Sequence, residues 1–174
     1  MVKFKPTKIS QRLTIVYAML FFVALAVVNF ATLLSVNYYI NQTSAHQLQM
    51  VSQTIVSDVK SLNDIPKIDL KKFSQIADNV DVSLIYNNRI IYNTGEQYTL
   101  KEAGGKNVGK VLKAESGENK IIYLIDTLSL NDGTKIVIQI VKDMDKEETY
   151  VHVLAGIMLF IDGFVFLLAI ILGY

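Results

Sequence analysis

The sequence predicts an α+β protein in which two membrane-spanning helices flank an antiparallel sheet, and the sheet packs on a long N-terminal helix. Three observations predict this fold class: two long apolar runs, an apolar stripe with helical spacing after the first run, and later segments of β-branched and alternating residues around turns. The chain has 174 residues, no Cys and a formal net charge of +1. It therefore offers neither disulfide bonds nor the strong positive field that nucleic acid would attract.

The two apolar runs are long enough to cross a bilayer. Residues 13–36 carry no formal charge, and at ~1.5 Å per residue they can span the ~30 Å of hydrocarbon. Residues 151–174 have similar length, and Asp162 is their only formal charge. We predict a transmembrane helix in each range. A cleaved signal peptide would have a shorter apolar core, of about 7–15 residues, than the first run has.

The flanking charges predict the orientation in the membrane. Residues 1–12 contain no Asp or Glu, and their cations are Lys3, Lys5, Lys8 and Arg12. This bias is typical of a cytoplasmic segment. We therefore expect a multi-pass protein of the cell membrane with a basic cytoplasmic N-terminus. Residues 37–150 would form an extracellular domain, in which acidic and basic residues nearly balance.

The first span is predicted to continue outward as one long helix. Its apolar stripe has spacings of three and four residues, at Leu48, Val51, Ile55, Val59 and Leu62. Residues 63–66 end with a proline and should terminate this helix. A shorter helix over residues 69–78, with Asp69 as N-cap, should follow. The stripe can cover the sheet or meet a second copy of the chain, and the sequence leaves both uses open.

Two hairpins are predicted after the helices. Residues 82–86 and 89–92 flank the turn formed by Asn87 and Asn88. Residues 120–125 and 135–140 flank a second turn at 131–133. One compact domain with a modest core is expected from residues 37–150. Residues 143–150 contain neither Gly nor Pro, so a helix there would connect the last strand to the second span.

The chain resembles the membrane sensor histidine kinases of bacterial two-component systems, in the class with a PAS-like or Cache-like extracytoplasmic domain between two transmembrane helices. The resemblance covers essentially the whole chain and rests on KISQRLTIVYAMLFF, DVSLIYNNRIIYNTG and YLIDTLSLNDGTKIVIQIVKDMDKEETYVHVL. It implies a PAS-like sensor domain in a homodimer whose four membrane helices relay an extracellular stimulus. The output would be autophosphorylation of a cytoplasmic kinase and phosphotransfer to a response regulator.

The resemblance also implies that this chain is the N-terminal sensory module of a longer kinase. Nothing in it matches the family's phosphoacceptor histidine box, ATP-binding motifs or HAMP linker, so no catalytic residue is carried over. We expect no cofactor in this chain, and ATP and Mg would belong to the kinase domain. The alternatives are the sensor part of a chemoreceptor or cyclic-dinucleotide enzyme, and a two-span membrane scaffold protein.

Asp162 is the most unusual residue of the second span. An ionised carboxylate near the bilayer centre costs a few kcal/mol unless it is paired or faces a packed interior. Asn29 is the other strongly polar side chain deep in a span, and we predict that both serve transmembrane signalling or packing. In untilted helices Asn29 would lie roughly 6 Å nearer the outside. Alternatively, Asp162 shares a proton with its copy in a dimer, or is merely tolerated beside Gly163.

Arg89 and Tyr92 are the candidate ligand-binding residues of the outer domain. The planar guanidinium of Arg89 can hold a ligand carboxylate, and Tyr92 would close the pocket. The alternative is an exposed arginine at the end of a strand. The two histidines, His46 and His152, lack neighbouring ligands for a metal, and the GxxxxGK spacing from Gly104 is expected to be a surface turn.

Overall fold

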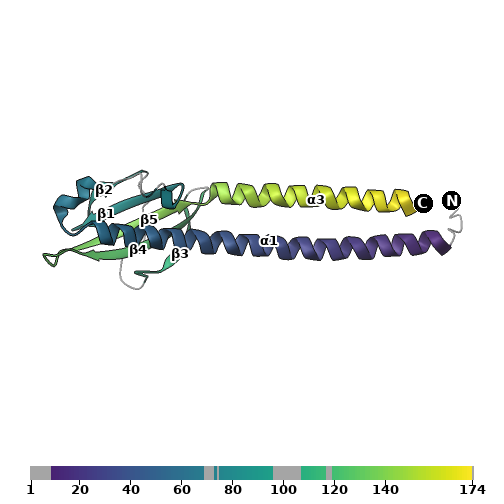
Figure 1. Ribbon diagram of the computed structural model, residues 1–174, viewed down its shortest axis with the longest axis horizontal. Coiled ribbons are helices and arrows are strands. Elements are labelled where there is room, and N and C mark those ends of the chain that lie inside the picture. The colour runs from purple at the N-terminus through teal and green to yellow at the C-terminus, as the bar shows by residue number, and fades with distance from the viewer. Residues whose placement is uncertain (1–8, 69–72, 74, 96–106, 117–118, 174) are drawn as a thin grey trace. The chain divides into compact units, whose positions relative to one another are not determined.

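The computed structural model describes residues 9–68, 73, 75–95, 107–116 and 119–173. The chain forms two compact units, one of residues 1–39 with 148–174 and one of residues 40–147. Two of the described helices, α1 (Ile9–Asp58) and α3 (Asp145–Gly173), are long and apolar enough to cross a membrane (Figure 1). At most 6% of the most apolar window of either helix is buried in the structure, which is unlike the core helix of a soluble protein.

Helix α1 is one unbroken helix of 50 residues that contains both the first apolar run and most of the apolar stripe that begins at Leu48. It ends at Asp58, earlier than the predicted end near Leu62, which instead begins the 3-10 helix η1 (Leu62–Lys67). The tighter turn is favoured because the Asp64 carboxylate accepts hydrogen bonds from the backbone N–H groups of Lys60 and Ser61, at 3.2 and 2.9 Å. The predicted N-cap Asp69 lies outside the described residues.

The unit of residues 40–147, which we call the outer unit, contains a sheet of five antiparallel strands in the order β2-β1-β5-β4-β3 (Figure 1). Their bounds are β1 Val80–Tyr86, β2 Arg89–Asn93, β3 Val111–Ser116, β4 Asn119–Ser129 and β5 Lys135–Asp143. The α+β class and both hairpins are confirmed. The sequence predicted only four strands, and β3 was missed. Its segment VLKAES is poor in β-branched and aromatic residues, so its pairing with β4 rather than its own propensity makes it a strand.

Both hairpin turns use backbone conformations with positive φ. Asn87 and Asn88 have φ of 49° and 57°, the combination that a two-residue type I′ turn requires. In the β4–β5 turn, Gly133 has φ of 82°, and Leu130 and Thr134 close the turn with a 2.9 Å backbone hydrogen bond. Asn and Gly are the residues that adopt this region most readily, so the sequence fixes both turns locally.

We expect Gly133→Ala to destabilise the outer unit by about 1–2 kcal/mol, because alanine pays a steric penalty at positive φ. A Cβ at this position would meet no atom within 4 Å, so the effect isolates backbone strain. The measurement is the urea midpoint of the variant. Gly133→Asn is the matched control and should lose less stability, since asparagine tolerates left-handed φ. Equal losses in the two variants would contradict the explanation.

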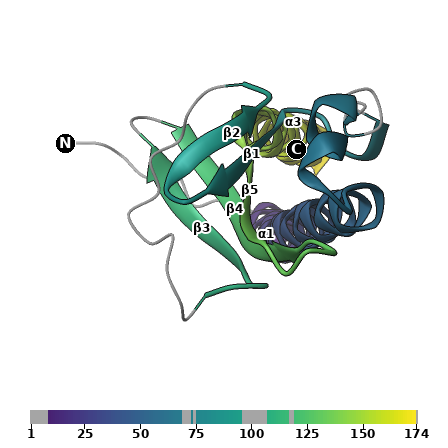
Figure 2. The same cartoon turned by 90° about the vertical axis from the view of Figure 1, so that its left-hand side faces the viewer.

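The main core lies between α1 and one face of the sheet (Figure 2). Helix α1 contributes the fully buried side chains of Leu48, Val51 and Ile55, and Val59, the residue directly after the helix, continues the stripe. The strands contribute alternate residues, which point to one face: Val82, Leu84, Ile122, Leu124, Leu128, Ile136, Ile138 and Ile140. The stripe therefore serves the core as far as Val59, whereas Leu62, its predicted last member, is 41% exposed in η1. The buried part of the stripe is not available to a second copy, which was the other use that the sequence left open.

A second, smaller cluster lies on the opposite face of the sheet and comprises Ile121, Tyr123, Ile125 and Val141. Strand β4 is consequently buried on both faces from Ile121 to Ile125, which explains its continuous apolar sequence IIYLI.

Candidate functional site

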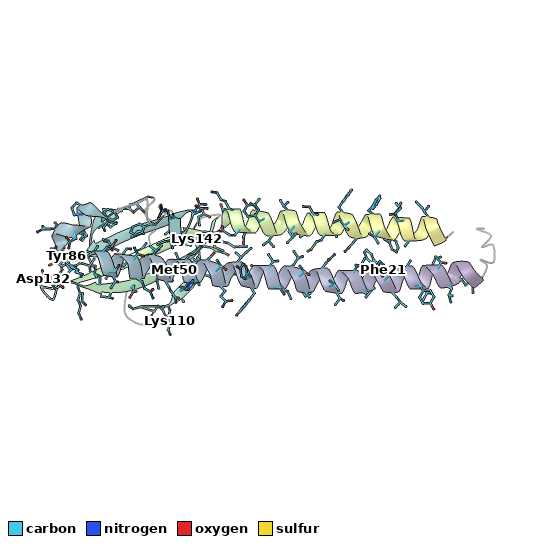
Figure 3. All side chains as sticks on the ribbon, viewed as in Figure 1. Phe21, Met50, Tyr86, Lys110, Asp132 and Lys142 are labelled. Carbon is cyan, nitrogen blue, oxygen red and sulfur yellow. The ribbon has the colours of Figure 1, made fainter. Side chains whose placement is uncertain are left out.

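A buried lysine connects the last strand, the outer part of α1 and the beginning of α3. Lys142 lies on β5 two residues after Ile140, so strand alternation directs it to the α1 face of the sheet (Figure 3). Its ammonium Nζ donates to Glu147 Oε1 at 2.8 Å, to Gln47 Oε1 at 2.9 Å and to Ser44 Oγ at 3.3 Å. An ammonium has three N–H groups, so these acceptors satisfy it completely. We call Ser44, Gln47, Lys142 and Glu147 the junction cluster.

The junction cluster is largely removed from water. The side chains of Lys142 and Glu147 are 5% and 21% exposed. Glu147 Oε2 is buried and has no hydrogen-bond partner in the described part of the chain. Buried charges of this kind are tolerated only while they remain paired. The ion pair therefore depends on the relative position of β5 and the first turn of α3, and a small separation would be costly.

Further polar contacts fix the first turn of α3 to the sheet. Asp143 Oδ1 accepts a 2.8 Å hydrogen bond from the N–H of Asp145, one of the N–H groups that a helix leaves unsatisfied at its start. Lys146 Nζ donates to Asn79 Oδ1 at 3.3 Å. The sheet thus holds the beginning of a helix that runs without interruption to Gly173.

Within the unit of the two apolar helix segments, the structure brings Asn29 and Asp162 together. Asn29 Nδ2 donates a 2.6 Å hydrogen bond to Asp162 Oδ2, and Asp162 is 9% exposed. The expected axial offset of roughly 6 Å does not separate them. The ends of an apolar run in the sequence give the ends of a helix only to within about one turn. The rings of Phe22 and Phe166 also pack against each other between the same two helices, with centroids 5.2 Å apart.

The structure places the candidate ligand residues in different environments. Arg89 is exposed at the beginning of β2, and Tyr92 is half-buried against the main core. The β1–β2 register pairs Tyr86 with Arg89 and Leu84 with Tyr92, with an irregularity between Leu84 and Ile85. Ligand binding by Arg89 and Tyr92 stays a prediction.

Tyr92 carries a buried hydroxyl that has no hydrogen-bond partner in the described ranges, and burial raises the pKa of its phenol. A raised pKa favours the neutral phenol in the folded state. The resulting stability is present below the unfolded pKa of about 10 and is lost as pH rises through the folded pKa. We expect Tyr92→Phe to be neutral or stabilising by up to about 1 kcal/mol at pH 7. It should also lessen the loss of stability above pH ~10.

Urea unfolding at neutral and alkaline pH tests this expectation. Tyr150→Phe, at a side chain that is 70% exposed, is the control and should leave stability at neutral pH unchanged. A clear destabilisation by Tyr92→Phe at pH 7 would reveal a hydrogen bond to the hydroxyl and contradict the prediction.

Comparison of the chain with protein-family models, curated proteins and solved structures finds no match. The junction cluster and the Asn29–Asp162 pair are therefore the features on which a proposed function can rest.

The described residues offer no set of three or more His, Cys, Asp or Glu side chains that could hold a metal ion. The GxxxxGK spacing begins outside the described residues. Its described end forms a turn in which Gly109 donates its N–H to the Ile125 carbonyl at 2.8 Å. Strand β3 follows this turn, whereas a phosphate-binding loop of this type leads into a helix.

Sequence reasoning missed the junction cluster. One signal was available: Lys142 continues the alternation of Ile136, Ile138 and Ile140, which places a cation in a row of core positions. Its acceptors come from two separate segments, α1 and α3, and could not be paired without the fold.

Proposed function

We propose that this chain is the sensory and transmembrane module of a bacterial sensor histidine kinase. The module would act as a homodimer in the cell membrane, with residues 37–150 outside. An extracellular stimulus would control a cytoplasmic kinase that uses ATP and Mg and passes a phosphoryl group to a response regulator. The observation that carries this proposal is the junction cluster, because it joins the outer sheet to both helices that continue into the apolar segments.

The proposed mechanism is a two-state movement at the junction cluster. In one state Lys142 holds the first turn of α3 against α1 through Glu147, Gln47 and Ser44. A stimulus that favours a different relation of β5 to α1 separates these groups and displaces α3. A ligand shifts such an equilibrium only by its difference in affinity for the two states. Because packed interfaces are bistable, a small change here can become a piston, tilt or rotation of the second span.

The Asn29–Asp162 hydrogen bond supports the same function at the level of the membrane. In hydrocarbon, polar side chains that bond across helices contribute to helix association and mark functional positions. The pair would couple the two spans of one chain, so that movement of α3 is resisted or transmitted by α1 at this level.

The test is a fusion of the chain to the cytoplasmic part of a histidine kinase with a transcriptional reporter, made at several linker lengths over one heptad. We expect Lys142→Met to change reporter output several-fold. Lys113→Met, at an exposed position on β3, is the matched control and should not change it. A response to Lys142→Met no larger than that of the control, in membranes that contain equal amounts of both variants, would contradict the proposed function. Fusion to a chemoreceptor or cyclic-dinucleotide output tests the alternatives.

A further inference from the structure

The outer part of α1 exposes a second face, opposite the one that enters the core. Its exposed residues recur at alternating intervals of four and three, at Gln42, His46, Gln49, Gln53 and Val56. This is the heptad spacing with which one helix lies along another. The core positions Leu48, Val51 and Ile55 fall between these residues on the opposite side of the helix. We call this surface the glutamine face.

The glutamine face carries no formal charge. Between Leu13 and Ser57 the sequence has no Asp, Glu, Lys or Arg, although the second half of this stretch belongs to the outer unit. On α1 the exposed charge of this unit is Asp58, the last residue of the helix, and other exposed charges lie elsewhere, at Lys60, Lys110, Lys113, Glu115, Lys120, Lys135, Asp145 and Lys146. The water-facing side of an amphipathic helix is usually charged. An exposed face of amides, an imidazole and a valine is therefore a specific feature of α1.

We propose that the glutamine face is the surface through which two copies of this chain pair, in parallel and around a two-fold axis. In such an interface each residue near the axis meets its own copy, so any charge there would face a like charge. A glutamine amide is both donor and acceptor, and two identical glutamines can therefore bond to each other. The parallel arrangement rests on the membrane anchoring in the proposed function, because α1 continues from this face into the first apolar segment.

The composition of the glutamine face also indicates how strong the pairing is. Polar residues at the a and d positions of a two-helix interface specify register and lower stability, and here Val56 is the one aliphatic residue of the five. Two free outer domains should therefore associate weakly. Anchoring in one membrane raises the effective concentration of the second copy and makes the pairing productive. A weak interface of this kind can be rearranged by a stimulus.

Cysteine scanning of the full chain in lipid vesicles tests the proposal. The natural sequence has no Cys, so each single variant forms only the symmetric disulfide. A disulfide requires Cα atoms within about 7 Å, so its yield reports proximity to the axis. We expect maxima for Gln42→Cys, His46→Cys, Gln49→Cys, Gln53→Cys and Val56→Cys. Lys113→Cys and Thr127→Cys, at exposed positions of the sheet, should give several-fold lower yields. Maxima at other positions, or a flat profile, would overturn the proposal.

A charge experiment in the same vesicles excludes collisional crosslinking. Gln49→Lys or Gln49→Glu in both copies should lower the disulfide yield of Gln53→Cys by about tenfold, since like charges across an interface repel. Mixing the Lys copy with the Glu copy should restore the yield. Thr127→Lys is the matched control and should have no effect. Failure of the mixed copies to recover the yield would overturn the two-fold arrangement.

The outcomes also separate this inference from the proposed function. A flat disulfide profile with a responsive reporter fusion would overturn the glutamine face and leave the sensory function intact. Heptad maxima with a silent fusion would support the glutamine face and count against signalling.

Discussion

Replacing Lys142 by methionine should destabilise the outer unit by about 3 kcal/mol, the largest effect that we expect from a single substitution. Methionine retains the apolar stem and removes the ammonium. The substitution deprives Gln47 and Ser44 of their donor and leaves the Glu147 carboxylate, which already has one oxygen without a described partner, without its cation. Losing one partner of a buried ion pair costs far more than the pair itself contributes. The measurement is the urea midpoint at which β4 and β5 lose protection from hydrogen exchange.

The double variant Lys142→Met with Glu147→Leu should recover most of this loss, because no charge is then left buried and alone. A double-mutant cycle through Glu147→Leu gives the coupling free energy of the pair. Lys113→Met, at an exposed lysine of β3, is the control for removing a cation and should change stability by no more than ~0.5 kcal/mol. Additive effects of the two junction substitutions would show that Lys142 and Glu147 act independently.

Most of the fold could be predicted from the sequence because the signals are local. The spacing of Leu48, Val51 and Ile55 indicates a helix. The turns at Asn87 and Gly133 each contain a residue that readily adopts positive φ. Strand β3 could not be predicted in this way. Lys113, Ala114 and Glu115 favour a strand weakly, and the hydrogen bonds to β4 supply the structure.

The candidate site was predictable only where one residue is unusual in its own segment. Asp162 is unusual because it is the only formal charge in an apolar run, and this alone identified it. Glu147 lies in the charged segment DKEE, where nothing distinguishes it from Glu148. Its role arises because the turn from β5 into α3 brings it back to Lys142. Local patterns do not encode a contact of this kind between segments.

The second large effect is expected at the polar pair of the apolar helices. Asp162→Leu should favour membrane insertion of α3 by about 3 kcal/mol, since leucine replaces an acidic residue in the middle of an apolar run. Asn29→Leu removes the hydrogen-bond donor at 2.6 Å and should weaken the association of α1 with α3 by about 1 kcal/mol. Insertion is measured by glycosylation of acceptor sites placed on either side of α3 in microsomes. Phe160→Leu, at a 75% exposed position of the same helix, is the control.

These two measurements separate stability from function at Asp162. If the carboxylate serves signalling, Asp162→Leu should ease insertion and yet abolish the stimulus-dependent change in a reporter fusion, and Asn29→Leu should weaken that change. A residue that opposes insertion but is needed for output is retained for the state that it helps to form, here a specific pairing of two helices. If Asp162→Leu eases insertion and leaves output unchanged, the carboxylate is merely tolerated, and the junction cluster alone would carry the coupling between the sheet and α3.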